Sequence, residues 1–222
     1  MHISVLGAGA WGTALAAALA PRHTVQLWAR DEAALAAIAR SRRNERYLPG
    51  VRLPAQLHCT GELASAVAQA RHGLLLIATP TAALRDLTRQ LREIGSLPPI
   101  VWLCKGLERG SAAMAHEIVR DELAGHPAGP LSGPSFALEV ARGLPTALAV
   151  AGHPSFCRIV TEALHMPSLR IYSTDDVVGV EVGGAVKNVM AIATGICDAL
   201  ALGNNARAAL ITRALAEISR FG

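Results

Sequence analysis

The glycine-rich segment at residues 7–12, GAGAWG, constrains the fold more than any other part of the sequence. It has the spacing GxGxxG, follows an apolar run of strand length at residues 2–6, and leads into an Ala-rich helical run at residues 11–20. The first glycine permits a tight turn, the second lets a pyrophosphate approach the backbone, and the third lets helix and strand pack closely. The segment therefore predicts a dinucleotide site at a helix N-terminus. Glycines that serve only the packing of helix against strand, with no ligand, would produce the same sequence pattern.

Strand-like and helical runs alternate through the first 174 residues. Strands are expected at residues 2–6, 24–28, 57–59, 73–78, 100–104, 130–132, 147–151 and 169–172. Helices are expected at residues 11–20, 31–42, 62–69, 82–92 and 111–124, and from about residue 155. This alternation predicts an α/β fold, a doubly wound, Rossmann-like and mostly parallel sheet with helices on both faces.

The pattern changes at residues 173–176, STDD, which form a good helix N-cap. The chain after them is expected to be helical, with a break at residues 203–205, GNN. We therefore predict a dinucleotide-binding domain at residues 1–174 and the first helices of an all-α substrate and dimerisation domain at residues 175–222. On this interpretation the second domain is truncated.

Composition excludes several classes of protein. With 51% hydrophobic residues, 17% charged residues and a net charge of +4, the chain is typical of a folded soluble protein. The four cysteines are far apart and form no CxxC, which favours reduced thiols in a cytoplasmic protein. The eight histidines have no metal-ligand spacing, so no metal site is expected.

The basic residues show one local cluster, at Arg40, Arg42, Arg43 and Arg46. Only Tyr47 adds an aromatic ring there, so no nucleic-acid surface is expected. The cluster is interpreted as a solvated helix end, which is also compatible with attraction of a phosphate-bearing small molecule.

Two apolar stretches have the length of targeting or membrane segments. Residues 3–20 end in an Ala-rich run like that of a signal peptide, but no basic residue other than His2 precedes them and they contain three glycines. Residues 185–202 are interrupted by Lys187, Asn188 and Asp198, which favours a buried or interfacial helix of a soluble protein. No integral membrane segment is expected.

The residue after the second expected strand bears on which dinucleotide binds. Arg30 stands there, and a guanidinium at this place could pair with the 2′-phosphate of NADP. Asp31 follows directly; it is expected to cap the next helix, but it could instead accept from a ribose hydroxyl of NAD. NADP or NAD is therefore predicted, with NADP favoured.

Only two of the 21 basic residues other than histidine are lysines, Lys105 and Lys187. Lys105 follows the expected strand 100–104, and ligands of doubly wound sheets bind beyond the carboxyl ends of strands, so its amine is predicted to face the cleft. A surface lysine after a strand would look the same. Lys187 lies among apolar residues, one turn after Gly183 and Gly184. This setting suits a partly desolvated amine that transfers protons. A lysine whose side chain reaches past apolar residues to the surface is the alternative.

The segment at residues 133–137, GPSFA, follows another short strand. It would present backbone N–H groups and the Ser135 hydroxyl at the start of a helix, which suits an anionic substrate or the nicotinamide portion of a cofactor. A plain helix-starting turn would have a similar sequence.

With these motifs in order, the chain resembles the bacterial NAD(P)-dependent glycerol-3-phosphate dehydrogenases. The resemblance runs through essentially the whole chain. The matching segments are GAGAWGTALA from residue 7, LWAR at 27–30, YLP at 47–49, KGLE at 105–108, SGPSFA at 132–137, GLPT at 143–146, VGGAVKN at 182–188 and NARAALITR at 205–213.

The resemblance implies roles for individual residues. The residues implied to contact the cofactor are Ala10, Trp11, Arg30, Lys105 and Ala137. The glycines of the turn, Gly7, Gly9 and Gly12, are predicted to bind it as well. Those implied to contact the substrate are Lys105, Gly133, Ser135 and Lys187. Lys187 would donate and accept the proton, Lys105 would add positive charge near the substrate, and Asn188 would orient it.

The implied activity is the interconversion of dihydroxyacetone phosphate and sn-glycerol 3-phosphate with NAD(P)H, which supplies glycerol phosphate for phospholipid synthesis; a homodimer is also expected. Family members continue for roughly another hundred residues, about the size of one small domain, with further site residues. Two alternatives therefore stay open: a cofactor-binding fragment without turnover, and a related β-hydroxyacid dehydrogenase with another substrate.

Overall fold

Two central strands, β1 (His2–Leu6) and β6 (Leu74–Ile77), lie at the core of the computed structural model, which describes residues 1–221. Along β6, Leu74 and Leu76 pack into one buried cluster and Leu75 and Ile77 into the other. Successive side chains of a strand point to opposite faces, so a continuous apolar run needs cover on both sides. The structure provides it and confirms the expected strand.

The main sheet has the strand order β10-β9-β8-β7-β6-β1-β2-β5. The strands not yet placed are β2 (Thr24–Trp28), β5 (His58–Thr60), β7 (Ile100–Trp102), β8 (Ala128–Ser132), β9 (Thr146–Ala151) and β10 (Leu169–Thr174). All neighbours run parallel except β8 and β9, which are antiparallel. The mostly parallel, Rossmann-like sheet is thus confirmed.

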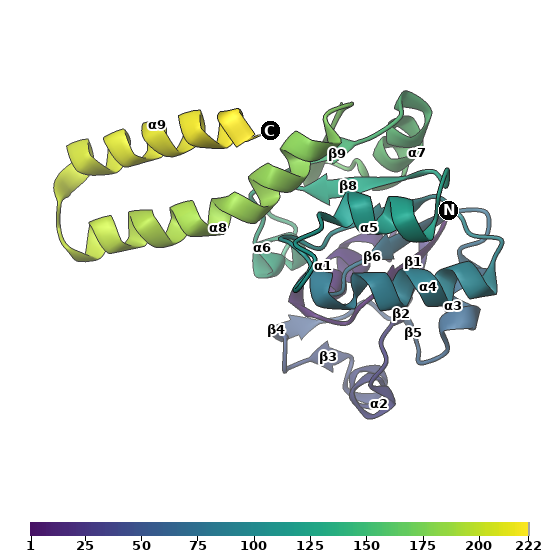
Figure 1. Cartoon of the computed structure of the whole chain (residues 1–222). Coiled ribbons are helices and arrows are strands. Elements are labelled where there is room, and N and C mark those ends of the chain that lie inside the picture. Colours follow the sequence, from purple (N-terminus) through teal and green to yellow (C-terminus); the bar gives the residue numbers. More distant parts are fainter. Residues whose placement is uncertain (222) are drawn as a thin grey trace.

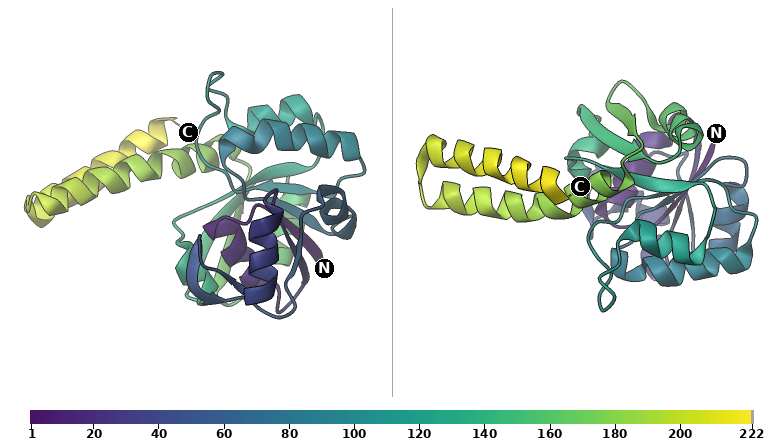
Figure 2. Two further views of the ribbon diagram at one scale, coloured as in Figure 1. Left: turned by 90° about the horizontal axis from the view of Figure 1, so that it is seen from below. Right: turned by 45° about the horizontal axis from the view of Figure 1, so that its top comes forward.

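Helices cover both faces of this sheet (Figures 1 and 2). One face is covered by α1 (Ala10–Leu19), α2 (Glu32–Ser41), α6 (Ala137–Ala141) and α7 (Pro154–Leu164). The other face is covered by α3 (Leu63–Gln69), α4 (Leu84–Ile94), which follows the short 3₁₀ turn η1 (Thr81–Ala83), and α5 (Ala115–Glu122).

Several ends of elements differ from the expected ones. The strand expected at 100–104 ends at Trp102, and the helix expected from residue 111 begins only at Ala115. At that helix start the Glu117 carboxylate accepts from the backbone N–H of Met114 at 2.8 Å, which stabilises the first turn. Asp31 caps α2 as predicted, since its carboxylate accepts from the N–H of Ala34 at 2.9 Å.

The passage after α2 is an antiparallel hairpin of β3 (Arg43–Asn44) and β4 (Leu48–Arg52), neither of which is among the expected strands. Arg42 ends α2 in the left-handed region, with φ 55°, and this turns the chain back toward the sheet. Its guanidinium donates to the carbonyl oxygens of Leu57, at 3.0 Å, and Pro54. The prediction of a solvated helix end was therefore wrong for Arg42, whose charge is turned inward onto backbone carbonyls.

Two long helices, α8 (Val177–Ala199) and α9 (Gly203–Phe221), extend from the sheet as an antiparallel pair (Figures 1 and 2). The Asp176 carboxylate caps α8 by accepting from the N–H of Gly179 at 2.8 Å. By length and composition alone α8 could span a membrane. This is weak evidence, because polar residues interrupt the helix and its first turns pack against the sheet.

We expect Gly73→Ala to destabilise the fold. A Cβ at residue 73 would overlap the backbone carbonyl of His2 and force β1 away from the chain entering β6. Overpacking of this kind costs about 1–3 kcal/mol, measured as the free energy of unfolding in urea.

Gly195→Ala is the matched control, because a Cβ there would have nothing within 4 Å. Within a helix the same change favours folding by about 0.5–1 kcal/mol. Equal effects of the two substitutions would contradict the packing of β1 against the start of β6.

Candidate functional site

The glycine turn between β1 and α1 has a different steric demand at each glycine. Gly7 has φ +126°, and a Cβ there would lie 2.7 Å from the carbonyl oxygen of Ala78. A Cβ at Gly12 would overlap the carbonyl oxygen of Gly7, whereas a Cβ at Gly9 would meet nothing within 4 Å. Gly9 is also the N-cap of α1 and has no side chain to bond the first-turn N–H groups. The turn therefore leaves open space and free donors where a pyrophosphate would bind.

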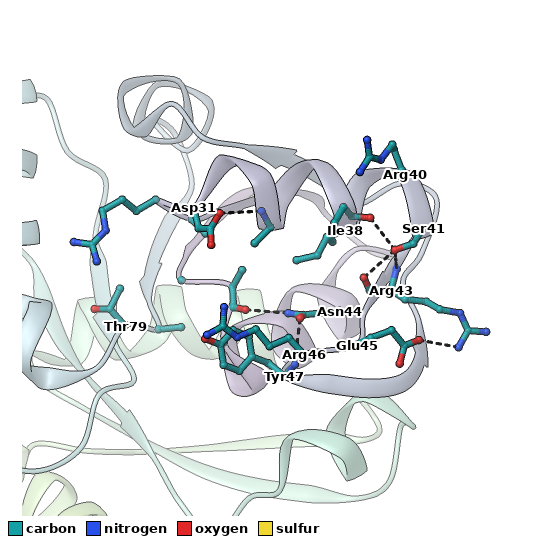
Figure 3. A pocket seen from close by; sticks show the side chains of 18 of the residues that line it. Asp31, Ile38, Arg40, Ser41, Arg43, Asn44, Glu45, Arg46, Tyr47 and Thr79 are labelled. Carbon is teal, nitrogen blue, oxygen red and sulfur yellow. Dashed lines mark hydrogen bonds and ion pairs between the residues drawn. The ribbon is translucent and has the colours of Figure 1, made fainter.

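A cavity of about 890 Å³ extends from this turn along α2 and the β3–β4 hairpin (Figure 3). Its walls include the glycine turn, the end of β2 and the loop after β6. The lining residues that bear on function are Gly7, Gly9, Arg30, Asp31, Arg46, Tyr47 and Thr79. The volume is in the range of cofactor and ligand pockets.

Arg30 and Asp31 differ in their availability to a ligand. Both line the cavity, and Arg30 is exposed at the end of β2. The Asp31 carboxylate is engaged in capping α2, as Figure 3 shows by its bond to the N–H of Ala34. The guanidinium is thus better placed to meet a ligand than the carboxylate is.

Asn44 joins the hairpin to the glycine turn, a role that the sequence did not reveal. Its side-chain amide donates to the carbonyl oxygen of Ala8 at 2.9 Å and to the Thr13 hydroxyl at 2.8 Å. The amide oxygen accepts from the N–H of Tyr47 at 3.3 Å. The Arg46 guanidinium lies 5.0 Å from the centre of the Tyr47 ring, and both line the cavity (Figure 3). Asn44 is buried, so it fixes this aromatic and cationic wall relative to the turn.

The two lysines meet at one backbone carbonyl. Lys105, in the loop after β7, donates its Nζ to the carbonyl oxygen of Gly133 at 3.3 Å. Lys187, on α8, donates to the same oxygen at 3.0 Å. Burial, and secondly the neighbouring Lys187, lower the pKa of Lys105 to about 8. Two cationic groups thus converge at the carboxyl ends of β7 and β8, where an anionic ligand would relieve their repulsion.

Close packing of α8 on the sheet makes this convergence possible. A Cβ at Gly184 would lie 2.5 Å from the Ser132 hydroxyl oxygen and 3.7 Å from Cγ of Lys105. The Ser132 hydroxyl is buried and has no hydrogen-bond partner among the described residues. Glycine at residue 184 lets α8 reach the end of β8, whereas a Cβ at Gly183 would meet nothing within 4 Å.

Comparison with known proteins identifies the family. The family model for the N-terminus of NAD-dependent glycerol-3-phosphate dehydrogenase matches residues 2–156, and the model for its C-terminus matches residues 176–222. The chain belongs to the NAD-dependent glycerol-3-phosphate dehydrogenase family. It is therefore an oxidoreductase of that family, as the motifs predicted.

Individual relatives agree with this assignment. A glycerol-3-phosphate dehydrogenase of Herminiimonas arsenicoxydans, whose name specifies NAD(P)+, is 58% identical over 225 residues, which cover all of this chain and 68% of that protein. One from Paucimonas lemoignei is 59% identical and is covered to 67%. The crystal structure of the Coxiella burnetii glycerol-3-phosphate dehydrogenase has a TM-score of 0.89 at 41% identity, over 99% of this chain and 68% of that one. The chain thus spans about two thirds of the length of these relatives.

The structure of this glycerol-3-phosphate dehydrogenase family member gathers the predicted site residues into two groups. The first surrounds the glycine turn and consists of Gly7, Gly9, Ala10, Trp11, Gly12 and Arg30. The second consists of Lys105, Gly133 and Lys187. Their roles toward cofactor and substrate stay predictions.

Three further predicted residues flank the lysine group. The Ser135 hydroxyl donates back to the carbonyl oxygen of Gly133 at 3.4 Å, and Ala137 is the first residue of α6. Asn188 follows Lys187 on α8 and is exposed.

We expect Lys105 to make the stability of the chain depend on pH above 8. Because the pKa of Lys105 is about 8 when folded and about 10.5 in an unfolded chain, the folded state binds fewer protons between these values. The lysine's unfavourable contribution is full below pH 8 and is relieved as pH rises to 10.5. Wild type should gain stability relative to Lys105→Met over this range, measured by urea unfolding at pH 7.5 and about pH 10. A constant difference between the two proteins would contradict the lowered pKa.

Proposed function

We propose that this chain binds NADPH, or NADH less tightly, and interconverts dihydroxyacetone phosphate and sn-glycerol 3-phosphate. The observation that supports this most is the convergence of both lysine ammonium groups on the Gly133 carbonyl, at the sheet edge where the glycine turn opens. A phosphorylated ketone needs positive charge and a proton donor, and the pair offers both. Membership of the glycerol-3-phosphate dehydrogenase family supports the choice of substrate.

The turn and the cavity fit a dinucleotide. The open space at Gly9 and the first-turn N–H groups of α1 would hold the pyrophosphate. The Tyr47 ring, with the Arg46 guanidinium over it, would lie against the adenine. Arg30 would pair with a 2′-phosphate, and this pairing is our reason for favouring NADP.

The proposed mechanism assigns proton transfer to Lys187. A bound nicotinamide supplies the hydride that reduces the carbonyl carbon. The Lys187 ammonium donates its proton to the carbonyl oxygen as negative charge develops there, and the neutral amine accepts it in the reverse direction. Lys105 adds positive charge beside the same oxygen. Arginine could not replace Lys187, because a guanidinium does not release its proton near neutral pH.

The remaining predicted residues would hold the substrate. Backbone groups around Gly133 and the Ser135 hydroxyl would bind polar groups of the substrate at the start of α6, where Ala137 would contact the cofactor. Asn188 would orient the substrate from the exposed side of α8. These assignments rest on position and on the family resemblance.

The wider context is part of the same proposal. The chain would act in the cytoplasm, as a homodimer, and its product would supply phospholipid synthesis. The domain division is proposed between residues 174 and 175, where β10 ends and the cap of α8 begins. The free thiols of all four cysteines agree with a reducing compartment.

Arg30→Ser tests the cofactor preference. We expect it to weaken NADPH binding about 10-fold or more, because a charge-assisted bond to phosphate is lost, and to leave NADH binding nearly unchanged. Dissociation constants from tryptophan fluorescence titrations would measure both. Arg71→Ser is the control, since Arg71 is exposed at the amino end of β6, away from the turn. Equal weakening for both cofactors would contradict a 2′-phosphate contact at Arg30.

Lys187→Arg tests the proton-transfer role. Where the wild-type protein turns over dihydroxyacetone phosphate, we expect the variant to lose about 100-fold or more in kcat and to keep its affinity for NADPH. Turnover is followed by NADPH absorbance and binding by fluorescence. Near-normal turnover with intact cofactor binding would rule out Lys187 as the acid and base.

A further inference from the structure

Three residues in the first half of α8 make contacts that bear on the lysine pair, and the sequence singled out only two of them. Gly184 packs on Ser132, and Lys187 reaches the Gly133 carbonyl. The third residue is Glu181, which is buried, with its side chain 6% exposed. At 100° per residue the three lie within an arc of roughly 120° on one side of the helix, and Glu181 precedes Lys187 by about 9 Å along the axis.

The Glu181 carboxylate is bonded to two other elements. One oxygen accepts from the Trp102 indole N–H at 2.7 Å and from the backbone N–H of His116 at 2.9 Å. The other accepts from Nδ1 of His116 at 2.6 Å. A buried carboxylate with this many donors is held firmly, and loss of one partner leaves polar groups unpaired.

The partners of Glu181 connect it to the lysine pair. Trp102 is the last residue of β7, and Lys105 follows it by three positions. Glu181 itself lies on the helix that contains Lys187. The Glu181 carboxylate therefore links β7, which leads to Lys105, with α8, which positions Lys187.

We propose that Glu181 is a positioning residue, whose bonds to Trp102 and His116 hold α8 in the register that brings Lys187 to Gly133 beside Lys105. It touches neither lysine and has no direct chemical role. Its consequence for turnover rests on the proposed function, but its effect on the geometry of the two lysines does not.

The chain offers a direct readout, because Lys105 and Lys187 are its only lysines. Burial and the neighbouring Lys187 lower the pKa of Lys105 to about 8. Both causes weaken if α8 moves away from the sheet, so the pKa of Lys105 would rise toward its ordinary value. A mutation that only lowered global stability would leave this pKa unchanged in the folded protein.

The experiment is a pH titration of the full chain after reductive methylation with ¹³C-formaldehyde, followed by NMR. The two lysine signals are assigned with Lys105→Arg and Lys187→Arg. For Glu181→Ala we expect the Lys105 midpoint to rise by about one pH unit or more. Glu181→Gln retains an acceptor for Trp102 and should give a smaller rise. Glu162→Gln, at an exposed position on α7, is the control and should give none.

A folded Glu181→Ala protein with an unchanged Lys105 midpoint would overturn the proposal. If that variant does not fold, Trp102→Phe decides the matter, because it removes one donor and leaves both bonds from His116. A rise in its Lys105 midpoint supports the proposal, and no change contradicts it. Failure of the proposed function would appear separately. The wild-type chain would then show no turnover, while the Lys105 midpoint would still rise in Glu181→Ala.

Discussion

Parallel pairing of β1 with both β2 and β6 determines where the glycine turn and the cavity around it lie. In a parallel sheet the carboxyl ends of the strands share one edge, so the loops that follow them are neighbours. The glycine turn after β1, Arg30 after β2, Thr79 after β6 and Lys105 after β7 all come from this edge. Segments that are distant in sequence are thus brought together by the direction and order of their strands, before any side chain contributes.

The sequence was sufficient for the parts of the fold that depend on strong local signals. The continuous apolar run of β6 and the GxGxxG turn predicted the sheet and its first crossover, because burial on two faces and a tight turn each leave a clear pattern. Lys105 was predicted to face a cleft from its place after a strand, and the glycines before Lys187 suited either a partly desolvated amine or a lysine reaching to the surface. Their contact with one shared carbonyl was not predicted, because it depends on how far α8 lies from β8.

The parts that sequence did not reveal depend on long-range contacts. Asn44 looks like a turn residue, and only the folded chain shows its amide bonded to Ala8, 36 positions away. Glu181 looks like an ordinary helical glutamate, yet its partners Trp102 and His116 lie 79 and 65 positions away. The hairpin of β3 and β4 is not among the expected strands, because proline and glycine at 49–50, which are unfavourable in strands, lie within β4 itself.

The antiparallel pairing of β8 with β9 determines which segment lies beside Gly133 and the lysine pair. Because Ser132 pairs with Ala149, the start of β9 at Thr146 extends about 10 Å past the end of β8, on the side where Gly133 lies. A Cβ at Gly133 would meet the Ala147 carbonyl oxygen at 2.7 Å, so β9 lies in close contact with the backbone at Gly133. The turn at residues 143–145 leads into this part of β9, which runs opposite to β8. The amino end of β9 thus lies at the same edge of the sheet as the carboxyl ends of β7 and β8, so the lysine site is bounded by strands of both directions.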